Sequence, residues 1–521
     1  MDRRRVTLIL TLSSIALTAY YIWRGRYLRA VASAASAIFT LSASRLLKVR
    51  RGLRVDGRLV DAIIHMYALS MGQVGPDDLI RAVAETREYG RYAEVFRRIR
   101  YLARELGYGF TRATMLIAEG VEQPLRDVLL RCVSVFSSLD PEGYLEMEAS
   151  TITEEFAGSY TRTLESLRVV GGVFNAFQSA IIFIIMTLSM LTVFMANPNV
   201  IYYAYGLSAI AILLMLLGLR VISAKEPLIH IGEEPPRLYK LMRRGLLALI
   251  PSTLIAVPAY LRWGAPALLL TLGLGFIIPG FFAQRLEAKV NQIDAYYPAF
   301  LKALGENMAS TASMKLSLTY ILDLELGPLR ELIERALNRI RLGISNHKAL
   351  MMMASEAASH NVYIANKVFL DAVGYGGDPL KVGKVLGNHI IKFLEFRKRR
   401  HAIAKSFDGL TLLMQMMIVA LLDLLIFLCS YFSGAMTALP FFNFGEIPME
   451  FVRLGNLAIA IYLSILNAVA GLEISSGFWG TLLWRLGLLL LLSGVAWLGV
   501  DLLMESVFYR MMPGFQTLIP V

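Results

Sequence analysis

Residues 409–432 read GLTLLMQMMIVALLDLLIFLCSYF and carry one charged side chain, Asp423. A run of at least about 18 apolar residues is typical of a helix that spans a membrane. The four basic residues RKRR at 397–400 stand shortly before this run, and Lys and Arg collect on the cytoplasmic flank of such helices. The stretch therefore predicts a membrane span that begins on the cytoplasmic side.

The composition of the whole chain argues against an ordinary soluble enzyme. Hydrophobic residues make up 56% of its 521 positions and charged residues 18%, whereas about a quarter of a soluble domain is charged. The net charge of +12 is typical, in a membrane protein, of cytoplasmic loops and lipid contacts, so nucleic acid is not an expected partner. Cys132 and Cys429 lie far apart without a CxxC motif, and no disulfide scaffold, metal site or cofactor is expected.

Similar apolar runs recur along the chain and predict an all-α, polytopic membrane protein with about nine transmembrane helices. Amphipathic helical stretches separate the runs and predict two cytoplasmic helical-bundle domains. The predicted regions are a transmembrane hairpin in 1–47, a first helical domain in 48–170, four spans in 171–283 with a polar loop at 224–244, a second helical domain in 284–407, and three spans in 408–521. The third and fourth of the four spans, 246–261 and 264–283, are divided by a predicted break at Arg262-Trp263.

Basic flanks set the expected orientation. Residues 45–54, Lys240 to Arg244 and the cluster at 397–400 are rich in Lys and Arg, which predicts that both helical domains face the cytoplasm in a multi-pass cell-membrane protein. The same span count puts the basic residues of the first hairpin, Arg24, Arg26 and Arg29, on the outer side. The placement of the hairpin 1–47 therefore stays open.

The clearest amphipathic helix is predicted over 328–342. Its apolar residues recur at helical spacing: Leu329, Leu332, Ile333, Ala336, Leu337 and Ile340. Pro328 suits the first turn of a helix and Gly343 its C-terminal stop.

The order of polar helical stretches and apolar spans also repeats within the chain, at a shift of 236 residues. The shift sets Gly107 on Gly343 and the span 172–195 on 408–431. An amphipathic helix ending in glycine, a helical region and a long helix entering the membrane thus occur twice. Two unrelated helical loops in a polytopic protein are the alternative interpretation.

Several motifs resemble a known family. The stretch YPAFLKALGEN at 297–307, with LGPL at 326–329, RIRLG at 339–343 and GGD at 376–378, is similar to the F-domain shared by type II secretion and type IV pilus platform proteins. The nine-span plan resembles the archaeal branch of that family, the membrane platforms of the archaellum and of adhesion pili. The first domain lacks the Gly-Gly pair in its corresponding loop, 137–140.

The resemblance implies a function without catalysis. Platform proteins of this kind sit in the cytoplasmic membrane, bind a hexameric secretion ATPase on the cytoplasmic side and hold the growing filament of pilin or archaellin subunits. The resemblance also implies two copies, a homodimer, under one filament. The resemblance covers both archaellum and pilus platforms.

Charge placement predicts where the ATPase binds. The cluster at 397–400 is either a topology anchor against anionic lipid headgroups or an electrostatic dock for an acidic partner surface, and the two roles are compatible. The second domain is net basic, whereas the first is near neutral with an acidic run between Glu142 and Glu155. The residues predicted to contact the ATPase are Arg339, Arg341, Lys381, Lys384, Arg397, Lys398, Arg399 and Arg400.

Asp423 in the middle of a span is the second candidate site. A carboxylate at that depth is costly unless it faces protein or water. The repeat shift makes Thr187 its counterpart, so the pair predicts either a hydrogen-bonded contact between helices or a polar contact for an entering pilin helix.

Two other functions compete with the platform. Repeated architecture and Pro- or Gly-interrupted spans, here at Pro251, Pro258, Pro266 and Pro279, also occur in secondary transporters. A purely structural membrane scaffold is the third possibility. Nucleotide hydrolysis by this chain is not expected, because Gly383-Lys384 is followed by Val385 where a phosphate loop needs Ser or Thr.

Overall fold

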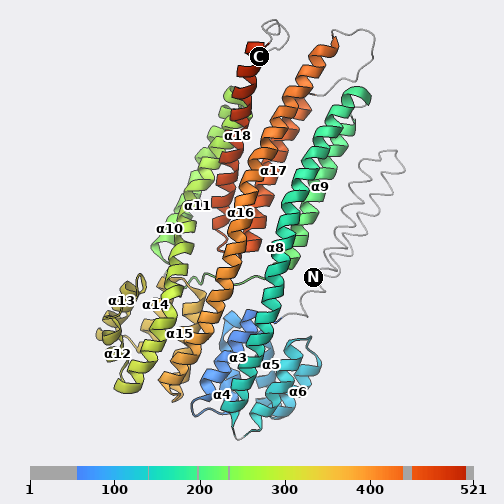
Figure 1. The fold of residues 1–521 in the computed structure, drawn as a ribbon. Helices are drawn as coiled ribbons and strands as arrows, with labels where there is room; N and C mark the ends of the chain where they lie inside the picture. Colours follow the sequence, from blue (N-terminus) through green and yellow to red (C-terminus); the bar gives the residue numbers. More distant parts are fainter. Residues whose placement is uncertain (1–54, 139, 196–198, 233–234, 438–448, 512–521) are drawn as a thin grey trace.

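The computed structural model describes residues 55–138, 140–195, 199–232, 235–437 and 449–511 (Figure 1). The described chain is helical, with one isolated bridge between Ile229 and Ser359. Its α-helices are α3 (Gly57–Ser70), α4 (Pro76–Glu85), α5 (Arg91–Arg104), α6 (Phe110–Glu119), α7 (Leu125–Cys132), α8 (Pro141–Met195), α9 (Asn199–Ile222), α10 (Arg237–Gly245), α11 (Leu249–Thr311), α12 (Met314–Ile321), α13 (Leu329–Arg341), α14 (Asn346–Ala357), α15 (His360–Gly374), α16 (Pro379–Thr437), α17 (Met449–Ser475) and α18 (Thr481–Met511).

The molecule has a polar end and an apolar end. Helices α3–α7 and α12–α15 gather at one end, and the long helices α8, α11 and α16 run from there into a bundle with α9, α17 and α18 (Figure 1). Among the described residues, 6 helices are long and apolar enough to cross a membrane. The described residues are thus all-α, as predicted, and their candidate spans support a multi-pass membrane protein. The first two predicted spans, in 1–47, lie outside the described residues.

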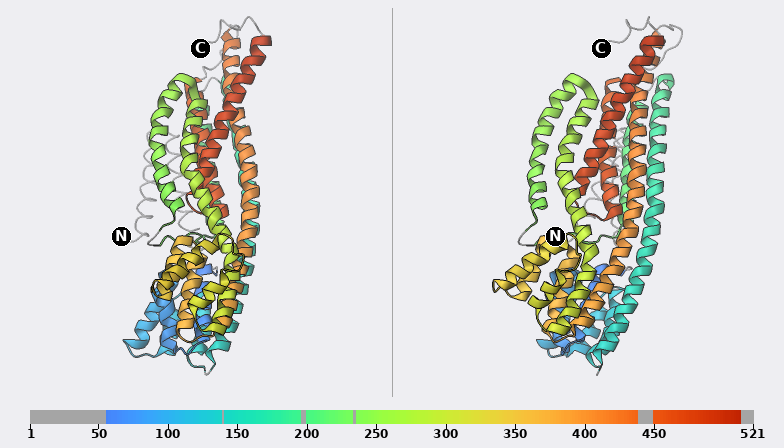
Figure 2. Two further views of the ribbon diagram at one scale, coloured as in Figure 1. Left: turned by 90° about the vertical axis from the view of Figure 1, so that its left-hand side faces the viewer. Right: turned by 60° about the vertical axis from the view of Figure 1, so that its left-hand side comes forward.

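The predicted spans 246–261 and 264–283 form the two arms of one hairpin. Both belong to α11 except for residues 246–248, which form a short 3-10 helix before it. The predicted break at Arg262-Trp263 falls next to the point where the chain turns, Gly264, whose φ is +75°. A left-handed φ of this kind favours glycine because it has no Cβ. Figure 2 shows the two arms of α11 joined by this turn, at the end of the hairpin that lies away from the polar helices.

Three helices cross from the polar end to the apolar end without a break at the border. Helix α8 has 55 residues and α16 has 59, and the second arm of α11 continues from Gly264 to Thr311. The predicted spans 172–195 and 409–432 are the apolar second halves of α8 and α16. At about 1.5 Å per residue, α8 and α16 are each more than about 80 Å long.

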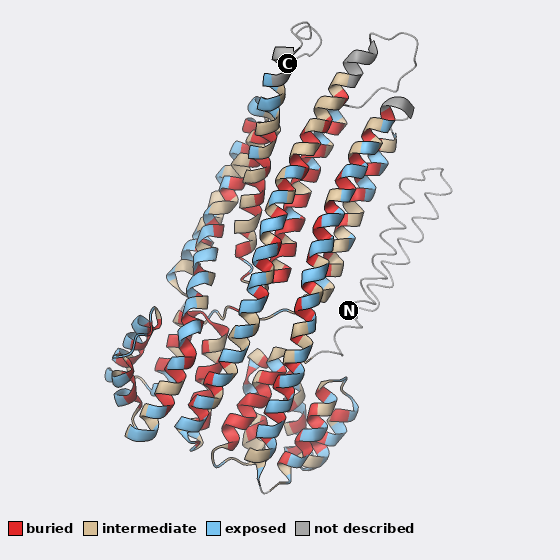
Figure 3. Ribbon diagram, in the orientation of Figure 1, coloured by how far each residue is buried: buried red, intermediate tan, exposed pale blue. Residues whose placement is uncertain are grey.

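The helices of the polar end share one hydrophobic core. Leu59 and Phe96 from the first polar stretch and Phe300 and Phe369 from the second belong to the same buried cluster. Figure 3 shows buried residues on the facing sides of these helices and exposed residues on their outer sides. The two stretches predicted as domains 48–170 and 284–407 thus pack as one body.

The shift of 236 residues reappears in the helix bounds. Helix α6 begins at Phe110 and α14 at Asn346 (346 − 110 = 236), and α8 begins at Pro141 and α16 at Pro379 (379 − 141 = 238). Between them, α7 corresponds to α15 in the same order. The same order of helices therefore occurs twice at the polar end, each time followed by a long helix into the bundle.

Local predictions within the polar end fare differently. Helix α13 spans Leu329–Arg341 with Pro328 as its N-cap and the predicted apolar face buried, which confirms the helix predicted over 328–342. The predicted polar loop 224–244 instead contains α10, Arg237–Gly245, which begins directly after Pro236. Proline fixes a φ that suits the entry of a helix, and the amphipathic residues that follow Pro236 form a helix where a polar loop is predicted.

In the apolar bundle, α11 and α18 approach each other through glycines. A Cβ on Gly280 would lie 2.4 Å from the Trp484 backbone nitrogen, and one on Gly487 would lie 2.8 Å from the Ile277 nitrogen. Small residues at such contacts allow the close helix packing that stabilises membrane bundles. Two further glycines in this interface are Gly273 and Gly494.

Candidate functional site

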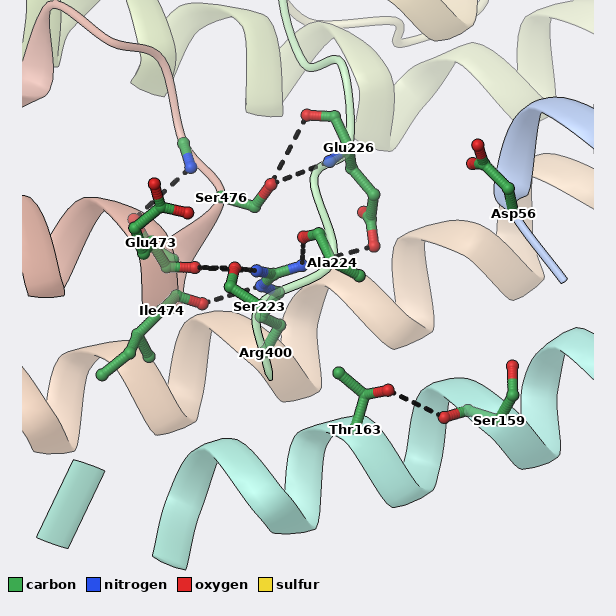
Figure 4. Close-up of polar contacts among 12 residues, drawn as sticks. Asp56, Ser159, Thr163, Ser223, Ala224, Glu226, Arg400, Glu473, Ile474 and Ser476 are labelled. Atoms are coloured by element: carbon green, nitrogen blue, oxygen red, sulfur yellow. Dashed lines mark hydrogen bonds and ion pairs between the residues drawn. The ribbon is translucent and has the colours of Figure 1, made fainter. Parts of the chain in front are cut away.

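The border between the polar end and the bundle is organised by the buried side chain of Arg400, which is 1% exposed. Its Nε donates to the Ile474 carbonyl at 2.7 Å and its Nη2 to the Glu473 carbonyl at 2.9 Å. Nη1 donates to the Ala224 carbonyl at 2.6 Å, and Nη2 also donates to the Ser223 hydroxyl at 3.0 Å. Figure 4 shows these contacts converging on the guanidinium from two segments distant in sequence.

Arg400 thereby caps the ends of two membrane helices. Helix α17 ends at Ser475 and α9 at Ile222, so the accepting carbonyls lie in the last turn of α17 and directly after α9. The last carbonyls of a helix lack partners within the helix and carry partial negative charge. A single guanidinium on α16 supplies donors and positive charge to both ends.

Acidic side chains complete this junction. The Glu226 carboxylate lies 3.6 Å from Arg400, and the nearly buried Glu473 carboxylate pairs with Arg220 at 3.3 Å and Lys225 at 3.7 Å. The Ser476 hydroxyl accepts a hydrogen bond from the Glu226 backbone N–H at 2.9 Å. The junction therefore ties α9, α16 and α17 and the segment after α9 into one polar network.

A second buried pair lies deeper in the polar end. Asp294 of α11 is fully buried and accepts from Arg397 of α16 at 2.5 Å and from the Asn361 amide at 3.0 Å. The hydroxyl of Ser359, the N-cap of α15, also donates to it. Because breaking such a pair leaves an uncompensated buried charge, Asp294 and Arg397 hold α11, α15 and α16 together.

Two histidine–carboxylate pairs join the two repeats. Asp61 and His65 stand one turn apart on α3; His389 of α16 lies 2.9 Å from Asp61, and Asp371 of α15 lies 3.3 Å from His65. The Tyr89 hydroxyl lies 3.0 Å from the other ring nitrogen of His65. Desolvation lowers the pKa of His65, against the opposing effect of Asp371.

A cavity of about 760 Å³ opens beside the Arg400 junction. Its walls come from α11, α16, the segment after α9 and the turn between α17 and α18. A smaller cavity of about 320 Å³ continues toward the bundle and shares Glu287 and His401 with the larger one. The smaller cavity includes the ion pair between Asp408 and Arg485, at 3.0 Å.

The structure divides the basic cluster at 397–400 between interior and surface. Arg397 and Arg400 point inward to the partners described above, whereas Lys398 and Arg399 are exposed, with Arg399 pairing with Glu395 at 2.6 Å. The expectation that all four residues serve as a surface dock is wrong for Arg397 and Arg400. Helical geometry explains the division, since positions three apart share a face.

The remaining residues predicted to contact the ATPase are also divided between interior and surface. Arg339 pairs with Glu356 within its own domain and is only 17% exposed, so the expectation that its side chain is left for a partner is wrong. Arg341 and Lys384 are exposed, and the exposed Lys381 lies 3.3 Å from Glu142 of the first repeat. These three keep a surface position.

Asp423 and Thr187 are not in contact. Thr187 is exposed and donates to the Phe183 carbonyl of its own helix. Asp423 is 5% exposed and interacts electrostatically with Asp501 of α18 and Arg453 of α17. The predicted hydrogen bond between Asp423 and Thr187 is therefore wrong, although Asp423 does face protein, as expected of a carboxylate at this depth.

Sequence reasoning missed a polar network inside the bundle. The Gln178 amide of α8 donates to Asn467 of α17 at 2.6 Å, and the Asn467 amide donates to Gln415 of α16 at 2.9 Å. Gln415 in turn donates to Ser464 of α17 and Ser493 of α18, each at 3.1 Å. The available signal was the presence of Gln and Asn within apolar runs, because such residues form hydrogen bonds across membrane helices.

These features define the class of the protein: a multi-pass helical membrane protein whose long helices continue into a polar, repeated helical part. The chain is similar to the Flagella accessory protein J of Methanocaldococcus jannaschii, with 24% identity over 378 residues, or 68% of this chain and 66% of the relative. It is also similar to the Flagella accessory protein J of Methanococcus voltae, with 22% identity over 371 residues and 66% of each chain. The match thus spans just under two thirds of these relatives' length.

These relatives confirm the resemblance to archaellum membrane proteins that the motifs indicated, at the level of distant similarity. No family model matches the chain. No solved structure matches it either.

Proposed function

We propose that the chain is the cell-membrane platform of an archaellum or type IV pilus-like assembly machine. In this role it catalyses no reaction itself and couples a hexameric secretion ATPase on the cytoplasmic side to the insertion of pilin or archaellin subunits into the filament. The observation that carries the proposal is the continuity of α8, α11 and α16 from the polar end into the apolar bundle. Stiff helices without a linker transmit a force applied at one end to the other.

The packing of the polar end supports the same role. One hydrophobic core joins both repeats, and Arg400 ties α16 to the ends of α9 and α17. A partner that moves the polar end therefore moves several membrane helices together. The basic flanks at Lys240 to Arg244 and at 397–400 support a cytoplasmic position for this end.

Exposed basic residues of the second repeat are the proposed ATPase contact. Lys381 and Lys384 stand in the first two turns of α16, and Arg341 stands in the last turn of α13. Opposite charge on the ATPase accelerates encounter and sets orientation more than it sets affinity. Lys398 and Arg399, closer to the bundle, are proposed to contact lipid headgroups or the ATPase rim.

Co-purification tests the proposal. The full chain in detergent is expected to retain a hexameric secretion ATPase of the same organism, and Arg341→Glu with Lys384→Glu should reduce retention at low salt. The matched control is Arg98→Glu with Arg126→Glu, two exposed arginines of the first repeat, which should change retention less. Equal retention by both double variants would remove the proposed contact, and no retention by the unmodified chain would remove the coupling function.

The transporter alternative has less support. Pro258, Pro266 and Pro279 all lie inside α11, and within this helix the non-helical dihedrals occur at Gly264, in the turn of the hairpin rather than at mid-span. Transporter sites are typically formed by helices interrupted near the bilayer midplane. The polar repeat also favours a protein partner over a small solute.

The oligomeric state belongs to the same proposal. Two copies under one filament follow from the resemblance to platform proteins. Mass measurement of the detergent-solubilised chain tests this, with a mass of two chains expected.

A further inference from the structure

Two adjoining cavities lead from the polar end into the apolar bundle. On α11, the lining of the larger cavity, about 760 Å³, runs from Lys302 to Glu287, which is 15 residues (302 − 287 = 15) or about 22 Å of helix. Glu287 stands shortly after the apolar run that ends at Ala283. Most of the larger cavity therefore lies beside the polar end, and only its last part reaches the border with the bundle.

The smaller cavity, about 320 Å³, begins where the larger one ends. Both are lined by Glu287 and His401. From His401 the lining of the smaller cavity continues along α16 to Leu412, inside the apolar run, and it follows α18 from Thr481 to Leu489. These eight steps along α18 (489 − 481 = 8) correspond to about 12 Å, so the smaller cavity extends well into the bundle.

The wall of the smaller cavity is strongly polar for its position. Five ionisable side chains line it: Glu287, His401, Lys405, Asp408 and Arg485. Asp408 and Arg485 form an ion pair at 3.0 Å. Ionisable residues within a membrane bundle face protein or a water-filled cavity rather than hydrocarbon. The chemistry of the wall thus favours water over a lipid chain as the content of the cavity.

Buried polar groups with unused hydrogen-bonding capacity stand directly behind this wall. Thr411 and Asn467 line the smaller cavity; the Thr411 hydroxyl donates to the Asn175 side-chain oxygen at 3.1 Å, and the Asn467 side-chain oxygen accepts from Gln178 at 2.6 Å. Among the described residues, the Asn175 amide nitrogen and the Gln178 amide oxygen have no hydrogen-bond partner. Both side chains are more than nine-tenths buried, at 5% and 1% exposed, and buried polar atoms are normally paired with protein or with ordered water.

We propose that the two cavities form a water-filled inlet, which leads from the polar end to the hydrogen-bond network of Gln178, Asn467 and Gln415 in the bundle. Asn175 and Gln178 stand three positions apart on α8 and share a face, so one water molecule can accept from the Asn175 amide and donate to the Gln178 oxygen. At about 30 Å³ for each molecule, the smaller cavity holds roughly ten waters.

The inlet changes the cost of moving the membrane helices. When α8, α16 and α17 shift relative to one another, Gln178, Asn467 and Gln415 lose partners on neighbouring helices. Water from the inlet replaces those partners, so the polar groups are not left unpaired during the shift. This consequence rests on the proposed platform function, whereas the inlet itself depends only on the chain's spanning a membrane.

The reaction of single cysteines with a charged thiol reagent in lipid nanodiscs tests the inlet. The background carries Cys132→Ala and Cys429→Ala, which remove the two native thiols. Leu488→Cys then places a thiol on the wall of the smaller cavity, and Ile465→Cys, 43% exposed on α17 and outside both cavities, is the control at comparable depth. Because the thiolate reacts and apolar surroundings suppress its formation, a trimethylammonium methanethiosulfonate is expected to modify Leu488→Cys at least about tenfold faster than Ile465→Cys.

A second pair of variants on α16 repeats the comparison at neighbouring positions. Leu412 lines the smaller cavity, whereas Leu413 is 61% exposed and does not line it. Leu412→Cys is expected to react faster than Leu413→Cys. This pair decides the question if the Tm of Leu488→Cys in detergent falls below that of the cysteine-free background.

A substitution at the shared wall tests the route. His401→Trp enlarges a side chain that lines both cavities, and it should slow the modification of Leu488→Cys several-fold. The modification of Asn291→Cys, whose position lines only the larger cavity, should keep its rate.

Two outcomes contradict the inlet. Equal rates for the cavity-lining cysteines and their controls, with Tm values that match the cysteine-free background, would mean that water does not enter the bundle here. An unchanged rate for Leu488→Cys in the presence of His401→Trp would mean that the two cavities are not connected. Neither outcome affects retention of the ATPase, so failure of the inlet and failure of the platform function are distinguishable.

Discussion

The Thr411 hydroxyl of α16 donates a hydrogen bond to the Asn175 side-chain oxygen of α8 at 3.1 Å, and the two residues are 236 positions apart in sequence. They occupy equivalent positions of the two repeats. Both side chains are buried. The repeats therefore meet in the membrane bundle at a self-complementary crossing of their long helices.

Removal of this hydrogen bond should weaken the bundle slightly. We expect Thr411→Val to lower the free energy of unfolding by about 0.6 kcal/mol and at most about 1.7 kcal/mol, the range measured for hydrogen bonds between membrane helices. The exposed Thr187 donates within its own helix, so Thr187→Val is the matched control and should have almost no effect. A double-mutant cycle with Asn175→Leu checks the coupling, and strictly additive effects would show that the bond contributes nothing.

Loss of Arg400 should be far more damaging. Arg400→Met leaves the Ile474 and Ala224 carbonyls without the guanidinium donors and the Glu473 carbonyl with the Ser223 hydroxyl alone. We expect a destabilisation of about 3–5 kcal/mol, typical of breaking a buried charged network. Arg399→Met, one position away and exposed, should change stability by less than about 0.5 kcal/mol. Thermal unfolding in detergent checks both values.

The substitution Arg400→Lys separates the contribution of the guanidinium geometry from that of the positive charge. Lysine keeps the positive charge but lacks the planar fork of donors, so Arg400→Lys should fall between the unmodified chain and Arg400→Met. Equal Tm values for Arg399→Met and Arg400→Met would refute the structural role of Arg400.

Acid should destabilise the polar end through buried histidine. Burial lowers the pKa of His360 to about 4, below the value of about 6.5 in an unfolded chain. The unfolded state then binds more protons between these values, so the stability from neutral His360 is complete above about pH 6.5 and is lost as the pH falls toward 4. From pH 7 to pH 5 the expected loss is about 2 kcal/mol.

Variants identify the histidine responsible. His360→Gln should flatten the dependence of stability on pH, and the exposed His347→Gln should leave it unchanged. Some dependence should remain, because burial also lowers the pKa of His65 and of His230. An unchanged slope in His360→Gln between pH 7 and 5 would contradict the assignment.

The contact between α11 and α18 should tolerate no side chain at its glycines. Gly280→Ala places a methyl group 2.4 Å from the backbone of Trp484, and such overpacking typically costs about 1–3 kcal/mol. Gly206→Ala on α9, where an added Cβ meets nothing within 4 Å, is the control. The Tm values of Gly280→Ala and Gly206→Ala in detergent test this expectation. Equal Tm values would mean that α11 and α18 separate readily.

Much of the fold followed from local patterns in the sequence. Long apolar runs predicted the membrane helices, and apolar residues at helical spacing predicted α13 closely. The turn of the α11 hairpin was predicted within two residues of Gly264. These features depend on neighbouring residues only, which is why they could be read directly.

The partners of charged side chains could not be predicted in the same way. The run at 397–400 indicated a basic surface, but burial of Arg400 depends on the carbonyls of α9 and α17, which lie far away in sequence. The repeat shift likewise paired Asp423 with Thr187. Equivalent residues touch at the crossing of α8 and α16, at Asn175 and Thr411, but twelve positions further along each helix Thr187 is exposed and Asp423 faces α18.

The position of Arg400 within α16 gives this helix the proportions of a lever. Arg400 stands 21 residues after Pro379 (400 − 379 = 21) and 37 residues before Thr437 (437 − 400 = 37), so the arms measure about 30 Å and about 55 Å. With Arg400 as the pivot, a tilt of α16 that moves its polar tip sideways moves the opposite tip in the reverse direction and nearly twice as far. A displacement of a few ångströms at the polar tip would then move the far tip of α16 by a distance comparable to one turn of a helix.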